Sequence, residues 1–282
     1  MFSDQSAAIQ ELLVGGFVVF MMLSVGIDLT VERIRDVFRK PAILISALTV
    51  NYVVVPIAFV LALKLFDIGG MWAVGLMFVA VAPGGPVAGV LIQNAGGNIA
   101  LGASMIVVMN ILNTVLTPIG FLSLESSAPT GLPMAGMVKT IILFQLLPLA
   151  AAMGFRHGQP DLADRYQPYI QQAAKVLLFG AAAVILAGEI PRLMTVPIKM
   201  IVFCHLAVPI MMGLGWLFTP GTRADRIAVS IATPYRSISV VLLLLASWVR
   251  DMDAMLAAMT YSGAMLWMCL AASTWMRRRW VS

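Results

Sequence analysis

Apolar runs about as long as a membrane helix recur from one end of the chain to the other. A helix needs roughly 20 apolar residues to cross the hydrocarbon core, and unpaired backbone groups cannot face lipid. Long runs without strand-like alternation favour helices over a closed barrel. The pattern predicts an all-α polytopic membrane protein with about nine spans, near 8–29, 41–63, 71–94, 98–123, 133–155, 172–190, 195–218, 226–249 and 254–276.

Two predicted spans carry interruptions that repeat at a nearly constant spacing. The third span is broken at Ala82-Pro83-Gly84-Gly85 and the eighth at Thr233-Pro234, 151 residues later. A Val-Pro-Ile tripeptide occurs in the second span at 55–57 and again in the seventh at 208–210, 153 residues later. Each pair of matching spans is five helices apart in the chain, and helices separated by an odd number cross the membrane in opposite directions. The spacing therefore predicts two inverted repeats, the first of them one helix short.

Composition and charge fit this topology. Of the 282 residues 61% are apolar and only 11% are charged, against about 25% charged residues in soluble domains. An N-terminus outside places twelve of the eighteen basic residues on the cytoplasmic side, as the positive-inside rule requires. These are Arg33, Arg35, Arg39, Lys40, Arg156, Arg165, Lys175, Arg223, Arg226, Arg277, Arg278 and Arg279. We expect a bacterial-type inner membrane protein with a cytoplasmic C-terminus and one membrane domain over 1–282.

Several other classes of function find no support in the sequence. There is no dense basic stripe with interleaved aromatics, which argues against a nucleic-acid partner. No nucleophile paired with a base, metal-ligand cluster or phosphate loop is visible, so we expect neither an enzyme nor a metal centre. Cys204 and Cys269 lie in apolar runs without close spacing, and we interpret both as packing residues. The first six residues lack the basic stretch of a cleaved signal peptide, so we expect them to stay.

The two interruptions are the strongest site signals. Proline removes a helix hydrogen bond, glycine lets the chain unwind, and unwound backbone in a membrane is tolerated only against protein or a water-filled cavity. Arg236 lies two residues after Pro234, with apolar runs on both sides. Placing an arginine inside a membrane helix costs at least about 3 kcal/mol on insertion scales. Its guanidinium either forms a structural ion pair or carbonyl clamp, or it binds a substrate carboxylate.

The fourth span adds a polar face. Asn110, Asn113, Thr114 and Thr117 recur at three- and four-residue steps and should point inward. Hydrogen bonding between helices and the lining of a cavity both explain this face. Our candidate substrate-binding residues are Pro83, Gly84, Gly85, Asn110, Asn113, Thr233, Pro234, Tyr235, Arg236 and Ser237.

Three stretches resemble the bile acid:sodium symporter family. They are 25–41 with its basic residues, the Pro-Gly-Gly at 83–85 followed by Gly-Asn-x-Ala-Leu at 97–101, and Thr-Pro-Tyr-Arg-Ser at 233–237. The resemblance covers nearly the whole chain and implies the nine-helix version of the fold, with two broken helices that cross. It also implies a panel part, near 8–29, 133–155 and 172–190, and a core part, near 41–123 and 195–276.

The chain also departs from this family. Typical sodium-coupled members carry side-chain oxygens where this chain has Ala88, Gly89 and Gly102, and a glutamate in the second crossing helix, where 231–237 holds no carboxylate. A hard cation needs several oxygen ligands, so we expect no conventional two-site sodium dependence and no other cofactor. The resemblance implies alternating-access transport of a small organic anion. The alternative is a membrane sensor or scaffold that retains the fold without transport.

Overall fold

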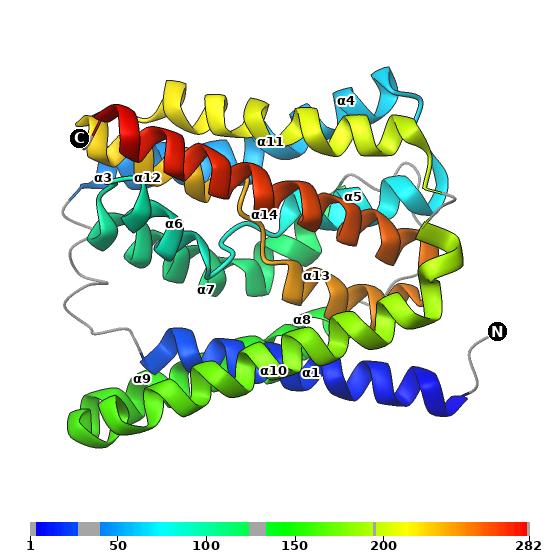
Figure 1. Ribbon diagram of the computed structural model, residues 1–282, viewed down its shortest axis with the longest axis horizontal. Helices are drawn as coiled ribbons and strands as arrows, with labels where there is room; N and C mark the ends of the chain where they lie inside the picture. Colours follow the sequence, from blue (N-terminus) through cyan, green and yellow to red (C-terminus); the bar gives the residue numbers. More distant parts are fainter. Residues whose placement is uncertain (1–3, 28–39, 124–133, 194–195, 281–282) are drawn as a thin grey trace.

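The structure is a computed structural model that describes residues 4–27, 40–123, 134–193 and 196–280. Within these ranges the chain is helical and forms no strand (Figure 1). The helices are α1 (Asp4–Ile27), α3 (Pro41–Thr49), α4 (Val55–Leu65), α5 (Gly70–Val81), α6 (Ala88–Asn94), α7 (Ile99–Ser123), α8 (Met134–Ile141), α9 (Leu147–Gly158), α10 (Pro160–Leu193), α11 (Ile198–Phe218), α12 (Arg223–Ala232), α13 (Ile238–Leu244) and α14 (Met252–Trp280).

Among the described residues, five helical stretches are long and apolar enough to cross a membrane. They run over Pro41–Leu65, Ile99–Phe121, Met134–Gly158, Ile198–Phe218 and Met252–Trp280. Shorter apolar helices cover Gly15–Ile27, Gly70–Val81 and Ile238–Val249. The membrane-helix class is therefore supported, whereas the nine spans and the inverted repeats stay predictions.

One helix differs from its predicted span. The apolar run at 172–190 belongs to α10, which has 34 residues and begins on Pro160. Proline is favoured in the first turn of a helix, where its missing N–H has no intrahelical partner to lose. The polar residues that precede the apolar run therefore extend the helix instead of ending it.

Two of the membrane-length helices contain wide turns beside a proline. The π segments η1 (Val50–Val54) and η2 (Ile142–Leu146) each end two residues before a proline, Pro56 and Pro148. Because proline cannot donate to the carbonyl four residues back, the helix relaxes by bonding over five residues. Both prolines are therefore accommodated by a π turn within a continuing helix. A third π segment, η3 (Leu245–Val249), extends α13.

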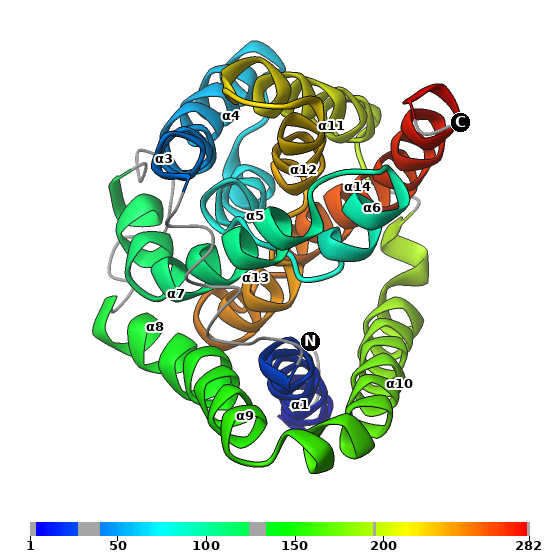
Figure 2. The ribbon, with the colours of Figure 1, turned by 90° about the vertical axis from the view of Figure 1, so that its left-hand side faces the viewer.

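The helices form two groups, and the interrupted helices belong to the larger one. Helix α1 packs along α9 and α10, and Figure 2 shows these three side by side with α8 next to them. The remaining helices form the larger group, in which α5 packs on α14 and α11 packs on α12 and α14. Contacts of α7 and α13 with α8 join the groups. The smaller group contains the spans expected in the panel part, and its movement as a unit stays a prediction.

Candidate functional site

The two interruptions lie against each other at the centre of the larger group. Helix α5 stops at Val81 and α6 starts at Ala88, while α12 stops at Ala232 and α13 starts at Ile238. Pro83 and Arg236 pair as an isolated antiparallel bridge. The N–H of Gly85 donates to the carbonyl of Tyr235 at 2.9 Å, and the N–H of Ser237 donates to the carbonyl of Ala82 at 2.8 Å. The predicted breaks and their meeting are confirmed, and we call this region the crossing, residues 82–87 and 233–237.

Glycine is required at two positions of the crossing, for different reasons. Gly84 has φ +89°, a conformation that other residues rarely adopt. Gly85 has an ordinary φ, but a Cβ there would lie 2.5 Å from the carbonyl oxygen of Arg236 and 2.7 Å from the ring of Tyr235. The Gly-Gly pair therefore serves both the turn and the close approach of the second break.

The polar face of α7 supplies hydrogen-bond donors for the first break. The side-chain amide of Asn110 donates to the carbonyl of Gly84 at 3.0 Å, and that of Asn113 donates to the carbonyl of Pro83 at 2.6 Å. The hydroxyl of Thr117 donates to the carbonyl of Val81 at 2.9 Å. In this conformation the face bonds one helix to another, which is one of the two roles that the sequence left open.

Two polar side chains that the sequence did not place at the site extend this network. The Tyr52 hydroxyl lies 2.7 Å from Oδ1 of Asn113 and 2.8 Å from the carbonyl of Met109, so its single proton serves one of them at a time. Gln145 donates from Nε2 to Oδ1 of Asn110 at 2.8 Å. Tyr52 lies in η1 and Gln145 in η2. The sequence feature that could have indicated both residues is a polar side chain one turn before a proline, because π turns often occur at functional sites.

Arg236 places a permanent positive charge at the crossing. Its side chain is 1% exposed, and no ion pair reaches it from the described residues. Within the same part of the chain, none of its three guanidinium nitrogens makes a hydrogen bond of acceptable length and angle. The guanidinium faces two neutral hydroxyls, those of Tyr52 and Tyr261, and the Tyr261 oxygen approaches it closely enough to favour the charge without forming a well-aligned hydrogen bond. The backbone N–H of Arg236 donates to the sulfur of Met265 at 3.2 Å. The described contacts thus support neither an ion pair nor a carbonyl clamp.

Further buried polar atoms surround the crossing without a hydrogen bond to any described residue. They are the hydroxyls of Ser237 and Thr114, Oδ1 of Asn51 and Oε1 of Gln145. Tyr235 is buried, and the carbonyl of Pro234 accepts from the Tyr261 hydroxyl at 2.7 Å. The Thr233 hydroxyl donates to the carbonyl of Val229 within its own helix. All ten sequence-predicted residues therefore lie in the crossing or on the face of α7 that contacts it.

A second polar cluster joins the starts of α3, α7 and α12. Oδ1 of the buried Asp225 accepts from Lys40 at 2.9 Å and from Asn98 at 2.8 Å, while Oδ2 accepts from the Thr222 hydroxyl at 2.9 Å. Burial alone would raise the pKa of this carboxyl, but the hydrogen bonds outweigh it and hold the pKa below its ordinary value. Asn98 also caps α7 by accepting from the N–H of Leu101 at 3.1 Å. The Gly-Asn-x-Ala-Leu motif thus ties α7 to α12.

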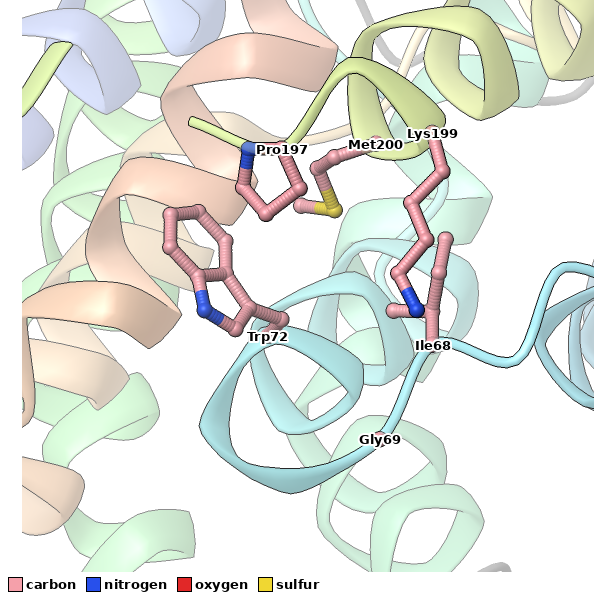
Figure 3. Close-up of a pocket in the computed structure, with 6 residues that line it drawn as sticks. All are labelled: Ile68, Gly69, Trp72, Pro197, Lys199 and Met200. Atoms are coloured by element: carbon pink, nitrogen blue, oxygen red, sulfur yellow. The ribbon is translucent and has the colours of Figure 1, made fainter. Parts of the chain in front are cut away.

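A small pocket of about 110 Å³ lies away from the crossing, between the α4–α5 connection and the start of α11. Figure 3 shows Trp72 and Ile68 on one side of it, with Pro197, Lys199 and Met200 on the other. The ammonium of Lys199 is already engaged by the carbonyl of Asp67. With apolar walls and an occupied cation, this pocket offers no chemistry for the predicted anion.

Comparison with known proteins gives one family and a group of transporters. Residues 17–196 match the model of the sodium bile acid symporter family, a segment that includes the first break and ends before the second. A protein of Oryza sativa called probable sodium/metabolite cotransporter BASS1, chloroplastic, is 28% identical over 165 residues, 58% of this chain and 41% of the relative. The Bacillus subtilis uncharacterized sodium-dependent transporter YocS is 31% identical over 104 residues, 36% of this chain and 32% of the relative. The matches therefore cover less than half of each relative.

Proposed function

Because this chain belongs to the sodium bile acid symporter family, whose members are transporters and not enzymes, we propose that it moves a small organic anion across a membrane by alternating access. Curated relatives are named as sodium-dependent transporters or as sodium/metabolite cotransporters. The substrate class and the coupling of this chain are argued below from its own residues.

The observation that supports an anion is the uncompensated charge of Arg236. A buried charge is normally paired, because leaving it without a partner costs several kcal/mol. The N–H groups of its guanidinium are available as hydrogen-bond donors, and they lie where the two broken helices expose backbone groups. A carboxylate matches the fork of the guanidinium through two parallel hydrogen bonds, which the single ammonium of lysine cannot reproduce. We therefore propose a small carboxylate as the substrate.

The moving parts follow from the packing. We assign α1, α8–α9 and α10 to a panel part and the helices that hold the crossing to a core part. The hydrogen bond from Gln145 to Asn110 then joins panel to core directly at the site. We also propose a bacterial-type inner membrane with the C-terminus in the cytoplasm. The end of α14 supports this orientation, because Trp280 stacks on Trp216 beside Arg223, as expected for an anchor at a positive-inside interface.

Flux through purified protein in liposomes tests this function. Vesicles with the protein should take up a labelled carboxylate faster than protein-free vesicles, and Arg236→Lys should keep the fold and the charge but lose most of the anion affinity. Arg236→Gln should lose affinity as well. Binding without flux would favour the sensor or scaffold alternative. Unchanged transport by a well-folded Arg236→Lys or Arg236→Gln variant would refute the role of the guanidinium.

A further inference from the structure

The cation at the crossing is covalently fixed. In a symporter, a bound cation leaves together with the substrate, so the empty carrier returns without it. The guanidinium of Arg236 cannot leave, and the described residues provide no carboxylate to balance it. Its described neighbours are neutral: the Tyr261 hydroxyl donates to the carbonyl of Pro234 and offers its oxygen to the guanidinium, and the sulfur of Met265 accepts from the backbone N–H of Arg236. Neither group carries a charge that could balance Arg236.

The carboxylate of Asp225 does not offset this charge. Both of its oxygens are already engaged, by Lys40 and Asn98 on one side and by Thr222 on the other. It lies at the start of α12, whereas Arg236 lies beyond the end of that helix. The described part of the crossing therefore carries one unbalanced positive charge whenever no anion is bound.

We propose that the transported anion is the counter-ion of Arg236 and that the chain consequently works as an anion exchanger. This inference rests on the proposed function. With one monovalent anion bound, the crossing has no net charge and can move between the two sides of the membrane. Without an anion, the same movement carries a net charge through a low-dielectric region, which is strongly disfavoured. Turnover therefore needs an anion on the return step too.

The charge balance also sets a preference among substrates. A monovalent anion neutralises Arg236, whereas a dicarboxylate leaves one net negative charge at the crossing. Monocarboxylates should therefore be exchanged faster than dicarboxylates of similar size. For the same reason sodium is not needed to balance a monovalent anion, since the chain supplies the cation itself.

Counterflow in proteoliposomes tests the proposal. The probes are labelled lactate, 2-oxobutyrate, benzoate and malate, added outside vesicles that contain either the same unlabelled acid or only sucrose and a zwitterionic buffer. For the monocarboxylates that are transported, uptake after subtraction of protein-free vesicles should be about tenfold faster or more when the acid is inside. Equal rates under both loadings would overturn exchange and leave transport standing. No uptake under either loading would refute the proposed function itself.

Variants isolate the charge from the fold. Arg236→Gln removes the charge, so the ratio between loaded and unloaded vesicles should fall towards one, whereas Arg236→Lys keeps the charge and should keep the ratio at a lower rate. Arg250→Gln is the matched control, because Arg250 is exposed at the end of the same broken helix and its loss should leave the ratio unchanged. Each variant is first checked for a monodisperse elution profile. If Arg236→Gln does not fold or takes up no labelled acid, a folded Arg236→Lys without the internal-anion requirement would still overturn the proposal.

Discussion

The close approach of the two breaks at Gly85 can be tested by adding a single methyl group. In Gly85→Ala the new Cβ would lie 2.5 Å from the carbonyl oxygen of Arg236, and that oxygen belongs to backbone that cannot turn away. The clash can be relieved only if the two breaks move apart, and this movement weakens the hydrogen bonds from Gly85 to Tyr235 and from Ser237 to Ala82. Overpacking costs about 1–3 kcal/mol and each lost hydrogen bond about 0.5–1.5 kcal/mol, so we expect a loss of roughly 2–6 kcal/mol.

The matched control lies four residues further along. A Cβ on Gly89 meets nothing within 4 Å, and Gly89 is in α6, where alanine is favoured over glycine by about 0.5–1 kcal/mol. Unfolding titrations in mixed micelles should therefore show Gly85→Ala destabilised and Gly89→Ala unchanged or slightly stabilised. If Gly85→Ala unfolds at the wild-type midpoint and transports normally, the close contact described at the crossing is not a feature of the working protein.

Three further predictions follow from other contacts. Replacing sodium by N-methylglucamine should leave carboxylate exchange unchanged, since Ala88 and Gly102 offer no side-chain oxygen; a sigmoidal dependence of uptake on sodium would contradict this. Tyr52→Phe should cost about 1–3 kcal/mol in unfolding titrations by leaving a buried acceptor unpaired, while Tyr166→Phe, which is exposed, should cost nothing measurable. Asp225→Asn should cost about 1–3 kcal/mol at neutral pH. Because the pKa of Asp225 is lowered in the folded state, its stabilisation is complete above about pH 4 and is lost as the pH falls through the folded pKa, so melting curves of the variant should lack that acid step.

The features that could be predicted from the sequence are those set by local chemistry. Proline and glycine disrupt a helix wherever they occur, so both breaks were predictable from the sequence. The similar spacing of two pairs of landmarks indicated that the breaks belong together. The inward face of α7 follows from helical periodicity alone. The charge of Arg236 and its apolar flanks were equally visible, and they correctly placed the residue in the interior of the protein.

The features that could not be predicted depend on which neighbour lies opposite. No local pattern shows that Tyr52 bonds to Asn113, because the two residues are 61 positions apart in the chain. The partners of Arg236 could not be predicted either. The sequence left open an ion pair, a carbonyl clamp or a substrate carboxylate, and only the three-dimensional contacts show neutral neighbours. The length of α10 was missed because polar residues at a helix start do not form an apolar run.

Pro56 and Pro148 affect their helices differently from Pro83, and the difference explains why the breaks must meet. Pro56 and Pro148 only widen a turn, because helix formers follow them and the N–H of the residue just before each proline bonds to the carbonyl five residues back. Pro83 is followed by Gly84 at φ +89°, so the helix cannot continue and several backbone groups lose their partners. Buried groups of this kind need replacements, and in this fold each break supplies them to the other, with the amides of α7 completing the set. A single break without its counterpart would leave these groups unpaired in the interior, so any change that removes one interruption should destabilise the other.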